Sequence, residues 1–324
     1  MKDLSVYREA IESHLSNILK VKEPVQLYEP ISYIMYLGGK RLRPVLTLMT
    51  CDYFDTPIEK AMNAALAIEL FHNFSLIHDD IMDHAPLRRG EETVHEKWDV
   101  NTGILSGDAM LILAYRLFED YDPELFRDLA KLFSKTAIEV CEGQQYDVAF
   151  ETRDDVSIDE YVKMIAYKTA VLLGAALKMG AMVANASEGS QKSLYDFGCN
   201  LGIAFQLQDD YLDAFGNAET FGKQVGGDII ANKKTFLYLK AMEQSAESDR
   251  ETLQHLFGIS PKDPSQKIET VKQIFQETGA AEATQLEIKK YTQMANKDLE
   301  SLELSEEKKQ AFRDFATTLM NRTV

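Results

Sequence analysis

The stretch FHNFSLIHDDIMD at residues 71–83 is an apolar run of helical character that ends in an acidic D-D-x-x-D motif. A second stretch, FQLQDDYLDAFG at residues 205–216, has the same motif after a similar run. Because residues four apart lie on one face of an α-helix, the first and last aspartates of each motif point the same way. Two such motifs, far apart in the chain, predict two helices that face each other across one cavity.

The aspartates of these motifs suggest a particular ligand. Carboxylates held close together repel one another unless a cation lies among them. Mg²⁺ prefers oxygen ligands and often shares them with substrate phosphates. The paired motifs therefore predict a diphosphate held by magnesium. The candidate metal-binding residues are Asp79, Asp80, Asp83, Asp209, Asp210 and Asp213.

Composition limits the class of protein. The chain has 324 residues, of which 45% are hydrophobic, so it can bury a large core. Its net charge of −17 argues against a nucleic-acid-binding protein, which usually has a basic surface. The three cysteines are widely spaced, which indicates neither a zinc site nor a disulfide framework and fits a reducing compartment. We see no signal peptide and no apolar run long enough to span a membrane, so we expect a cytoplasmic protein.

Helical periodicity dominates the chain, and neither a β-alternating stretch nor a linker-like segment interrupts it. We therefore predict one all-α domain over residues 1–324. Ser157 with Glu160 fits a capping box, and Pro123 suits a first helical turn. The segment 101–118 is apolar on most faces, which predicts burial in a core or at a subunit interface. The expected helices are 3–20, 26–37, 41–52, 58–83, 101–119, 124–149, 157–184, 190–214, 229–245, 265–278, 280–300 and 305–321.

Two basic motifs could bind phosphate. In GGKRLRP (38–44), the glycines allow a close approach of the backbone to a ligand, and a helix that begins here would offer N–H groups to an anion. In LRRG (87–90), the two adjacent arginines diverge and could contact two different phosphates, for which arginine is well suited. Taken alone, the first motif is more simply a solvated basic turn, and the second could simply neutralise the aspartates beside it.

His72 precedes Asp79 by seven residues, two turns along the same helix face, so a ligand-binding role stands beside that of an ordinary core histidine. A competing interpretation is a di-iron protein, because Glu69-x-x-His72 and Glu92-x-x-His95 have the spacing used in di-iron helix bundles. The second pair follows an arginine–glycine break, and iron would leave both D-D-x-x-D motifs unexplained. We therefore disfavour this interpretation.

Taken together, these motifs resemble the trans-isoprenyl diphosphate synthases, or polyprenyl synthetases, of the short-chain farnesyl and geranylgeranyl type. The resemblance extends from about Gly38 to Lys240. It implies the isoprenoid synthase fold, a bundle of long antiparallel helices around a central cavity, usually as a homodimer. The motifs that carry it are GGKRLRP (38–44), FHNFSLIHDDIMDHAPLRRG (71–90), GDAML (107–111), GQQYD (143–147), KTAVLL (168–173), FQLQDDYLDAFG (205–216) and GKQVGGDIIANKK (222–234).

The resemblance also implies the reaction. A magnesium-dependent prenyltransferase of this family condenses isopentenyl diphosphate with dimethylallyl, geranyl or farnesyl diphosphate and releases pyrophosphate. Three Mg²⁺ ions, with Mn²⁺ as a substitute, would neutralise the leaving diphosphate. No side chain resembles a dedicated base, and the released pyrophosphate is expected to take the proton.

Site residues follow from the same resemblance. Asp79, Asp83 and Asp209 match the magnesium ligands, and the other three aspartates match carboxylates that bind or support the metal. The allylic set is Arg88, Lys168, Thr169, Gln206, Lys223 and Lys233, in which Thr169 and Gln206 line the allylic cation. The isopentenyl diphosphate set is Lys40, Arg43, His72 and Arg89. Near the C-terminus, Arg322 is a further candidate to close over a diphosphate.

Product length is expected to depend on the helix before Asp79. Phe74 precedes Asp79 by five residues, about 7.5 Å along the axis at about 1.5 Å per residue. Phe71 and Phe74 could form successive floors of the cavity, whereas the small Ser75 leaves one side open. By analogy with the family, this pattern predicts C15–C20 products, with geranylgeranyl diphosphate favoured over farnesyl diphosphate.

Three related functions compete with this one. A class I terpene cyclase normally has a different second metal motif and needs no isopentenyl diphosphate site. A head-to-head synthase of the squalene type is disfavoured on similar grounds. A non-catalytic partner subunit would typically lack aspartates or lysines from these motifs, and here all of them are present.

Overall fold

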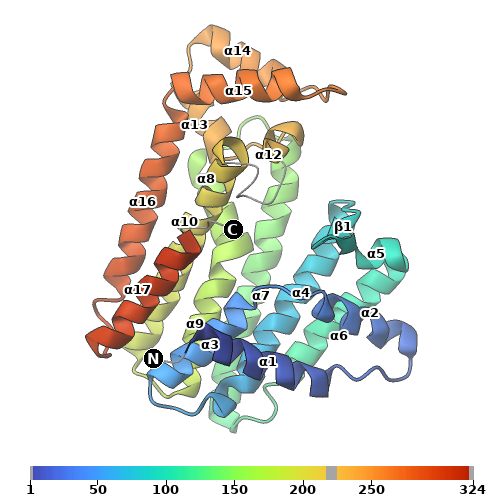
Figure 1. Cartoon of the computed structure of the whole chain (residues 1–324), viewed down its shortest axis with the longest axis vertical. Helices are drawn as coiled ribbons and strands as arrows, with labels where there is room; N and C mark the ends of the chain where they lie inside the picture. The colour runs from blue at the N-terminus through green and yellow to red at the C-terminus, as the bar shows by residue number, and fades with distance from the viewer. Residues whose placement is uncertain (1–2, 217–224, 321–324) are drawn as a thin grey trace. The chain divides into compact units, whose positions relative to one another are not determined.

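The computed structural model describes residues 3–216 and 225–320. Lys223 and Arg322, two of the predicted site residues, lie outside these ranges. Apart from a hairpin of β1 (Leu87–Arg88) and β2 (Glu91–Glu92), the regular structure in the described ranges is helical (Figure 1). The all-α prediction is therefore confirmed.

The chain divides into two compact units. The first contains residues 1–135 and 175–195, and the second contains residues 136–174 and 196–324. The prediction of a single domain over residues 1–324 stays a prediction, and the two units are described in turn.

The first unit is built around α4, which packs against α3 and α6. Its helices are α1 (Leu4–Ile18), α2 (Val25–Tyr36), α3 (Leu42–Tyr53), the short 3-10 helix η1 (Ile58–Ala61), α4 (Met62–Met82), α5 (Val94–Lys97) and α6 (Val100–Arg116). Gly107 of α6 allows the close approach of α4, because a Cβ there would lie 2.4 Å from Nε2 of His78. This packing buries most of α4 and fixes the position of the acidic end of the helix.

The predicted apolar segment 101–118 has two different faces in the structure. Gly103, Ser106 and Met110 are buried, whereas Leu105 and Ile112 are each 60% exposed. A helix of a soluble protein rarely exposes several large apolar side chains without a partner. This face is therefore a candidate subunit interface.

The remaining helices lie wholly or partly in the second unit. They are α7 (Pro123–Thr152), α8 (Ile158–Ile165), the π-helical turn η2 (Ala166–Ala170), α9 (Val171–Val183), α10 (Glu188–Phe215), α12 (Gly227–Ile230), α13 (Phe236–Gln244), α14 (Glu247–Leu256), α15 (Ser265–Glu277), α16 (Ala280–Asp298) and α17 (Glu306–Met320). The first residues of α7 and α10 and most of α9 belong to the first unit. As predicted, α7 begins at Pro123, and Ser157 and Glu160 form a capping box at the start of α8.

Three helix predictions need correction. The predicted helix 157–184 is interrupted by the π-helical turn at 166–170. The predicted helix 229–245 is two helices, because Asn232 adopts a left-handed backbone with φ of 58° and ends the first of them. The sequence analysis missed α14 because its residues are mostly polar and give only a weak apolar pattern.

One stretch within the described ranges, Ile158–Val183, is long and apolar enough to cross a membrane. Of its most apolar window, 72% is buried inside the structure, as in the core helices of many soluble proteins. The expectation that the chain has no membrane-spanning segment stays a prediction.

Candidate active site

The first acidic motif occupies the C-terminal end of α4. Asp80 is only 1% exposed, and the guanidinium of Arg88 from β1 binds it. Nε of Arg88 donates to Oδ1 at 3.0 Å and to Oδ2 at 3.2 Å, and Nη2 donates to Oδ1 at 2.5 Å. Asp83 is the exposed C-cap residue of α4, and Asp79 is partly exposed. Asp79 and Asp83 can therefore offer oxygen atoms to a metal, whereas Asp80 has the geometry of a supporting carboxylate.

The two basic motifs meet in the first unit. Arg89 has a left-handed backbone, and its Nη1 donates a hydrogen bond to the carbonyl oxygen of Gly38. A Cβ at Gly39 would lie 2.9 Å from the guanidinium carbon of Arg89, so the glycine at this position makes room for the arginine. Lys40 is exposed in the same turn. The structure thus brings together residues that are about 50 positions apart in the sequence.

His72 lies in the same cluster. Nη1 of Arg43 is 3.2 Å from Nε2 of His72. Burial lowers the pKa of His72 well below its usual value, and the positive charges of Arg43, Arg89, Arg88 and Arg41 lower it further. His72 is therefore neutral near pH 7, so its Nε2 can accept a hydrogen bond from Arg43. Together with Lys40 and Arg89, this pair completes the set predicted for isopentenyl diphosphate.

Beneath this cluster is an ion pair to which the sequence analysis gave no role. Arg41 and Glu69 are both buried, with Nη1 of Arg41 2.5 Å from Oε1 of Glu69. Nδ2 of Asn73 donates to the same oxygen at 3.0 Å. A glutamate inside an apolar helix such as α4 is itself a signal, because a buried charge requires a partner.

The second acidic motif, on α10, has a different environment. Asp210 is 5% exposed and accepts hydrogen bonds from the hydroxyl of Tyr161 and, at 3.0 Å, from Nε2 of Gln206. Burial raises the pKa of Asp210 to about 8, and the negative charges of Asp228 and Asp209 contribute to this shift. A cation at this motif would relieve the repulsion among these carboxylates.

Asp213 holds the start of α12. Its Oδ2 accepts from the backbone N–H of Asp228 at 2.9 Å, and its carbonyl oxygen accepts from the N–H of Gly226 at 2.6 Å. Nζ of Lys233 lies 4.0 Å from Oδ1 of Asp228. Asp213 therefore orients the segment that carries Asp228 and Lys233.

Lys168 and Thr169 belong to the π-helical turn, a feature often found at functional sites. Nζ of Lys168 is 2.5 Å from Oδ2 of Asp147, and the hydroxyl of Thr169 is 3.4 Å from Oε1 of Gln206. A Cβ at Gly143 would lie 2.3 Å from the backbone nitrogen of Lys168, so this glycine permits the contact between α7 and the turn. The π-helical turn thus contacts two other sequence motifs of the second unit, GQQYD through Lys168 and FQLQDDYLDAFG through Thr169.

The residues predicted to limit product length are in the first unit. Phe74 is 8% exposed, and its ring centroid is 5.5 Å from that of Phe71. Phe71 in turn contacts Phe133, with 5.3 Å between centroids. Ser75 is only partly buried, and its hydroxyl donates to the carbonyl oxygen of His72 at 2.9 Å.

The di-iron interpretation finds no support in this geometry. Glu69 is paired with Arg41, Glu92 lies in β2, and His95 lies in the short helix α5. Within residues 3–216 and 225–320, no group of three or more histidine, cysteine or carboxylate side chains could hold a metal by itself. Mg²⁺ is usually bound by one or two carboxylates together with substrate phosphates and water. The partly exposed Asp79, in the first unit, and Asp209, in the second, each have the exposure that such a ligand needs.

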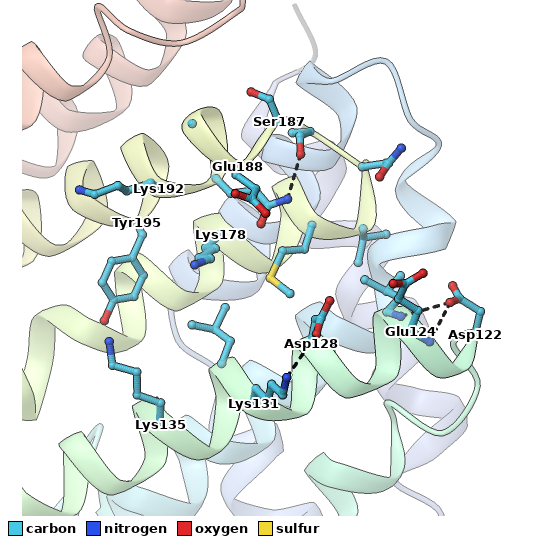
Figure 2. Close-up of a pocket in the computed structure, with 18 residues that line it drawn as sticks. Asp122, Glu124, Asp128, Lys131, Lys135, Lys178, Ser187, Glu188, Lys192 and Tyr195 are labelled. Carbon is cyan, nitrogen blue, oxygen red and sulfur yellow. Dashed lines mark hydrogen bonds and ion pairs between the residues drawn. The ribbon is translucent and has the colours of Figure 1, made fainter.

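A pocket of about 1410 Å³ is present elsewhere in the first unit (Figure 2). It is lined by the start of α7, the end of α9 and the start of α10, and its walls carry Lys131, Lys135, Lys178 and Lys192. The residues that line it include no predicted site residue. The pocket is therefore separate from the residues that the sequence predicts for the site.

The chain is similar to known proteins over most of its length. The family model described as "Polyprenyl synthetase" matches residues 24–278. A geranylgeranyl pyrophosphate synthase from Geoglobus acetivorans is 37% identical over 298 residues, which cover 91% of each chain.

The solved structures to which the chain is similar include geranylgeranyl pyrophosphate synthases. A crystal structure of a geranylgeranyl pyrophosphate synthase is 54% identical, covers 100% of both chains and superposes with a TM-score of 0.95. A geranylgeranyl pyrophosphate synthase from Corynebacterium glutamicum, complexed with isoprenyl diphosphate and magnesium, is 25% identical with a TM-score of 0.88 and covers 99% of this chain and 100% of that one.

Proposed function

The chain belongs to the polyprenyl synthetase family, and from that premise we propose that it condenses isopentenyl diphosphate with an allylic diphosphate to make a C15–C20 all-trans prenyl diphosphate. Geranylgeranyl diphosphate is the favoured product, in agreement with the names of the relatives described above. Dimethylallyl, geranyl and farnesyl diphosphate are the candidate primers.

One observation carries this proposal beyond the family match. The chain has a basic cluster around a neutral histidine in its first unit and two D-D-x-x-D motifs whose outer aspartates Asp79, Asp83 and Asp209 keep some exposure to solvent. A terpene cyclase has no use for the basic cluster, because it binds a single diphosphate substrate. A condensing enzyme needs separate positions for two diphosphates.

The basic cluster would bind isopentenyl diphosphate. Arg43 and Arg89 donate to neutral groups, His72 and the carbonyl oxygen of Gly38, so their charge remains to attract a diphosphate. Lys40 is exposed beside them and adds a third positive charge. Arginine and lysine together can neutralise a diphosphate without a metal.

The second unit would bind the allylic substrate. Lys168 and Lys233 supply positive charge near Asp147 and Asp228. The hydroxyl of Thr169 and the amide oxygen of Gln206 are neutral oxygens that could face an allylic cation without reacting with it. Arg88, bound to Asp80, and Lys223 complete the predicted set.

Magnesium would be held by Asp79, Asp83 and Asp209, with Asp80, Asp210 and Asp213 in support. Bound with diphosphate, it would act as a Lewis acid that stabilises the charge on the leaving group. Three ions, replaceable by Mn²⁺, are proposed. The raised pKa of Asp210, caused by burial and then by Asp228, supports a site whose carboxylates need a cation.

We further propose that the chain is a cytoplasmic homodimer. The exposed apolar side chains of α6, among them Leu105 and Ile112 at 60% exposure, support an interface on this helix. Measurement of the molar mass in solution by light scattering would test it.

The function is tested by incubating the purified chain with Mg²⁺, labelled isopentenyl diphosphate and each allylic primer in turn, and by sizing the products by chromatography. Elongation to one main C15 or C20 product is expected. Cyclic hydrocarbon from any primer would instead indicate a terpene cyclase, and a lack of elongation from every primer would indicate a non-catalytic subunit.

A further inference from the structure

The Arg41–Glu69 ion pair is well shielded from solvent. The two side chains are 4% and 3% exposed, and Nη1 of Arg41 is 2.5 Å from Oε1 of Glu69. Nη2 of Arg41 also donates to the carbonyl oxygen of Met35, at the end of α2. A single guanidinium thus connects α2 and α4 at the point where α3 begins.

The backbone of Arg41 is unusual. It is the N-cap residue of α3 and has φ of 49° and ψ of 34°, in the left-handed region that glycine adopts most easily. Glycine at this position would relieve the backbone strain. The position nevertheless holds an arginine, and its side chain makes two buried contacts. We conclude that the side chain has a function of its own.

The ion pair lies directly behind the diphosphate-binding residues. Arg41 is flanked in the sequence by Lys40 and, two residues on, by Arg43, and Glu69 precedes His72 by one helical turn on α4. Burial lowers the pKa of Arg43, and the negative charge of Glu69 counteracts this effect. The pair therefore influences both members of the Arg43–His72 contact, one through α3 and the other through α4.

We infer that Arg41 and Glu69 are positioning residues for isopentenyl diphosphate, a role that rests on the proposed function. They fix the N-terminus of α3 against α4, so that Arg43 and His72 face the substrate in a preformed arrangement. They also neutralise each other, so that the positive charge of the cluster resides on Lys40, Arg43 and Arg89. Neither residue needs to touch the substrate.

This role differs from simple stabilisation in a measurable way. A residue pair that serves only the fold would lower the amount of active enzyme, and therefore the apparent kcat, and would leave both KM values unchanged. Removal of a residue pair that positions Arg43 and His72 would raise the KM of isopentenyl diphosphate much more than the KM of the allylic substrate. The KM ratio of the two substrates is therefore the informative quantity.

The main variant is the double substitution Arg41→Met with Glu69→Gln. Removal of one partner alone would leave a buried charge and could prevent folding, whereas the double variant removes both charges and keeps the side-chain volumes similar. The single variant Glu69→Gln is measured in parallel, where it folds, with circular dichroism to establish folding.

The structure offers a matched control at the other end of α3. The hydroxyl of Tyr7 donates to Oδ2 of Asp52 at 2.7 Å and ties α1 to the last turn of α3. Arg41 and Asp52 are separated by eleven residues, about 16 Å along the helix axis. Tyr7→Phe therefore removes a structural anchor of the same helix far from Arg43.

Steady-state kinetics with both substrates, and calorimetric titration of isopentenyl diphosphate, provide the test. In the double variant, we expect the KM and Kd of isopentenyl diphosphate to rise about tenfold, as after the loss of one charge-assisted contact, with less than a twofold change for the allylic substrate. In Tyr7→Phe, both KM values should stay within twofold of the wild type.

Two outcomes would overturn the inference while the wild-type chain elongates normally. One is a KM of isopentenyl diphosphate in the double variant that is unchanged or rises no more than that of the allylic substrate, and the other is an equal effect of Tyr7→Phe on isopentenyl diphosphate. A wild-type chain that does not elongate any primer would instead refute the proposed function itself.

Discussion

The two D-D-x-x-D motifs have the same spacing but opposite electrostatic surroundings. In the first motif the central aspartate, Asp80, is held by the cation of Arg88. In the second, the equivalent Asp210 is held by the neutral donors Tyr161 and Gln206. Among the residues that the structure describes, Asp80 has a counter-ion, whereas the two donors that hold Asp210 are neutral.

The residues around each motif extend this contrast. Four arginines lie close enough to His72 to lower its pKa, although burial is the larger cause. Around the second motif, Asp228 and Asp209 raise the pKa of Asp210, again after burial. The first motif therefore borders a region prepared for an anion, whereas the second is a cluster of acids that requires a cation. The charged residues around each motif therefore determine whether an anion or a cation is favoured beside it.

The largest expected effect is that of metal removal. Chelation of divalent cations should lower turnover at least about 10³-fold, because the leaving diphosphate would lose its main source of charge stabilisation. Addition of Mg²⁺ should restore it. The rate of pyrophosphate release, followed in a coupled assay, is the measurement.

The contrast between the motifs also predicts which of the two diphosphate substrates can bind in the absence of metal. Isopentenyl diphosphate should still bind measurably in the presence of a chelator, because Arg43 and Arg89 can neutralise it. A non-reactive allylic diphosphate analogue should bind only when Mg²⁺ is present. Equal dependence of both ligands on metal, measured by calorimetry, would show that the two motifs do not differ in this way.

The second prediction compares the two central aspartates. In the metal-free protein, Asp80→Asn should lower the free energy of unfolding by about 2 kcal/mol, less than for a fully buried pair because the Arg88 side chain keeps 29% exposure. At about pH 4, Asp210→Asn should change it little, because the raised pKa keeps Asp210 protonated in the folded protein and asparagine keeps the hydrogen-bonding shape. Denaturant unfolding measures both, and similar losses would contradict the comparison.

The third prediction concerns pH. Burial raises the pKa of Asp210 to about 8 in the folded protein, from about 3.9 in an unfolded chain. Between these values the folded state binds the extra proton, so the contribution of Asp210 to stability falls as pH rises from about 4 to about 8. The difference in unfolding free energy between wild type and Asp210→Asn isolates this effect, in metal-free buffer. A difference that is constant from pH 5 to 9 would exclude it.

The sequence was enough to identify the helices that carry both motifs and the basic residues near the first. Apolar periodicity and the aspartates are local signals, and they placed the acidic ends of α4 and α10 correctly. The contact of Tyr161 with Asp210 was beyond prediction, because the two residues are 49 positions apart and meet only through packing within the second unit. The π-helical turn was missed for a similar reason, since Gly143 on another helix makes the space for it.

The segments before the two motifs also differ, and this gives the fourth prediction. Phe71 and Phe74 form an aromatic pair before the first motif, whereas Gln206, before the second, makes polar contacts. Phe74→Ala should therefore lengthen the main product by at least one C5 unit with little change in overall rate. Unchanged chain length by chromatography would show that Phe74 is not the floor of the cavity.

The smallest effect is expected at Lys267, which supports the segment that carries Lys233 in the way that Arg41 is inferred to support Arg43 and His72. Lys267 is 3% exposed, and its ammonium donates to two neutral oxygens, Oδ1 of Asn232 and the carbonyl of Ile259 at 3.0 Å. Asn232 adjoins Lys233, so the lysine fixes one end of the segment that Asp213 fixes at the other.

Lys267→Met keeps the aliphatic stem and removes these hydrogen bonds. We expect the KM of the allylic substrate to rise about threefold, which corresponds to the net contribution of a single hydrogen bond, and the KM of isopentenyl diphosphate to stay constant. The exposed Lys262, on the loop before α15, supplies the matched control Lys262→Met, for which neither KM should change. A selective effect on isopentenyl diphosphate in Lys267→Met would contradict the assignment of the allylic substrate to the second unit, because this lysine holds Asn232 beside Lys233.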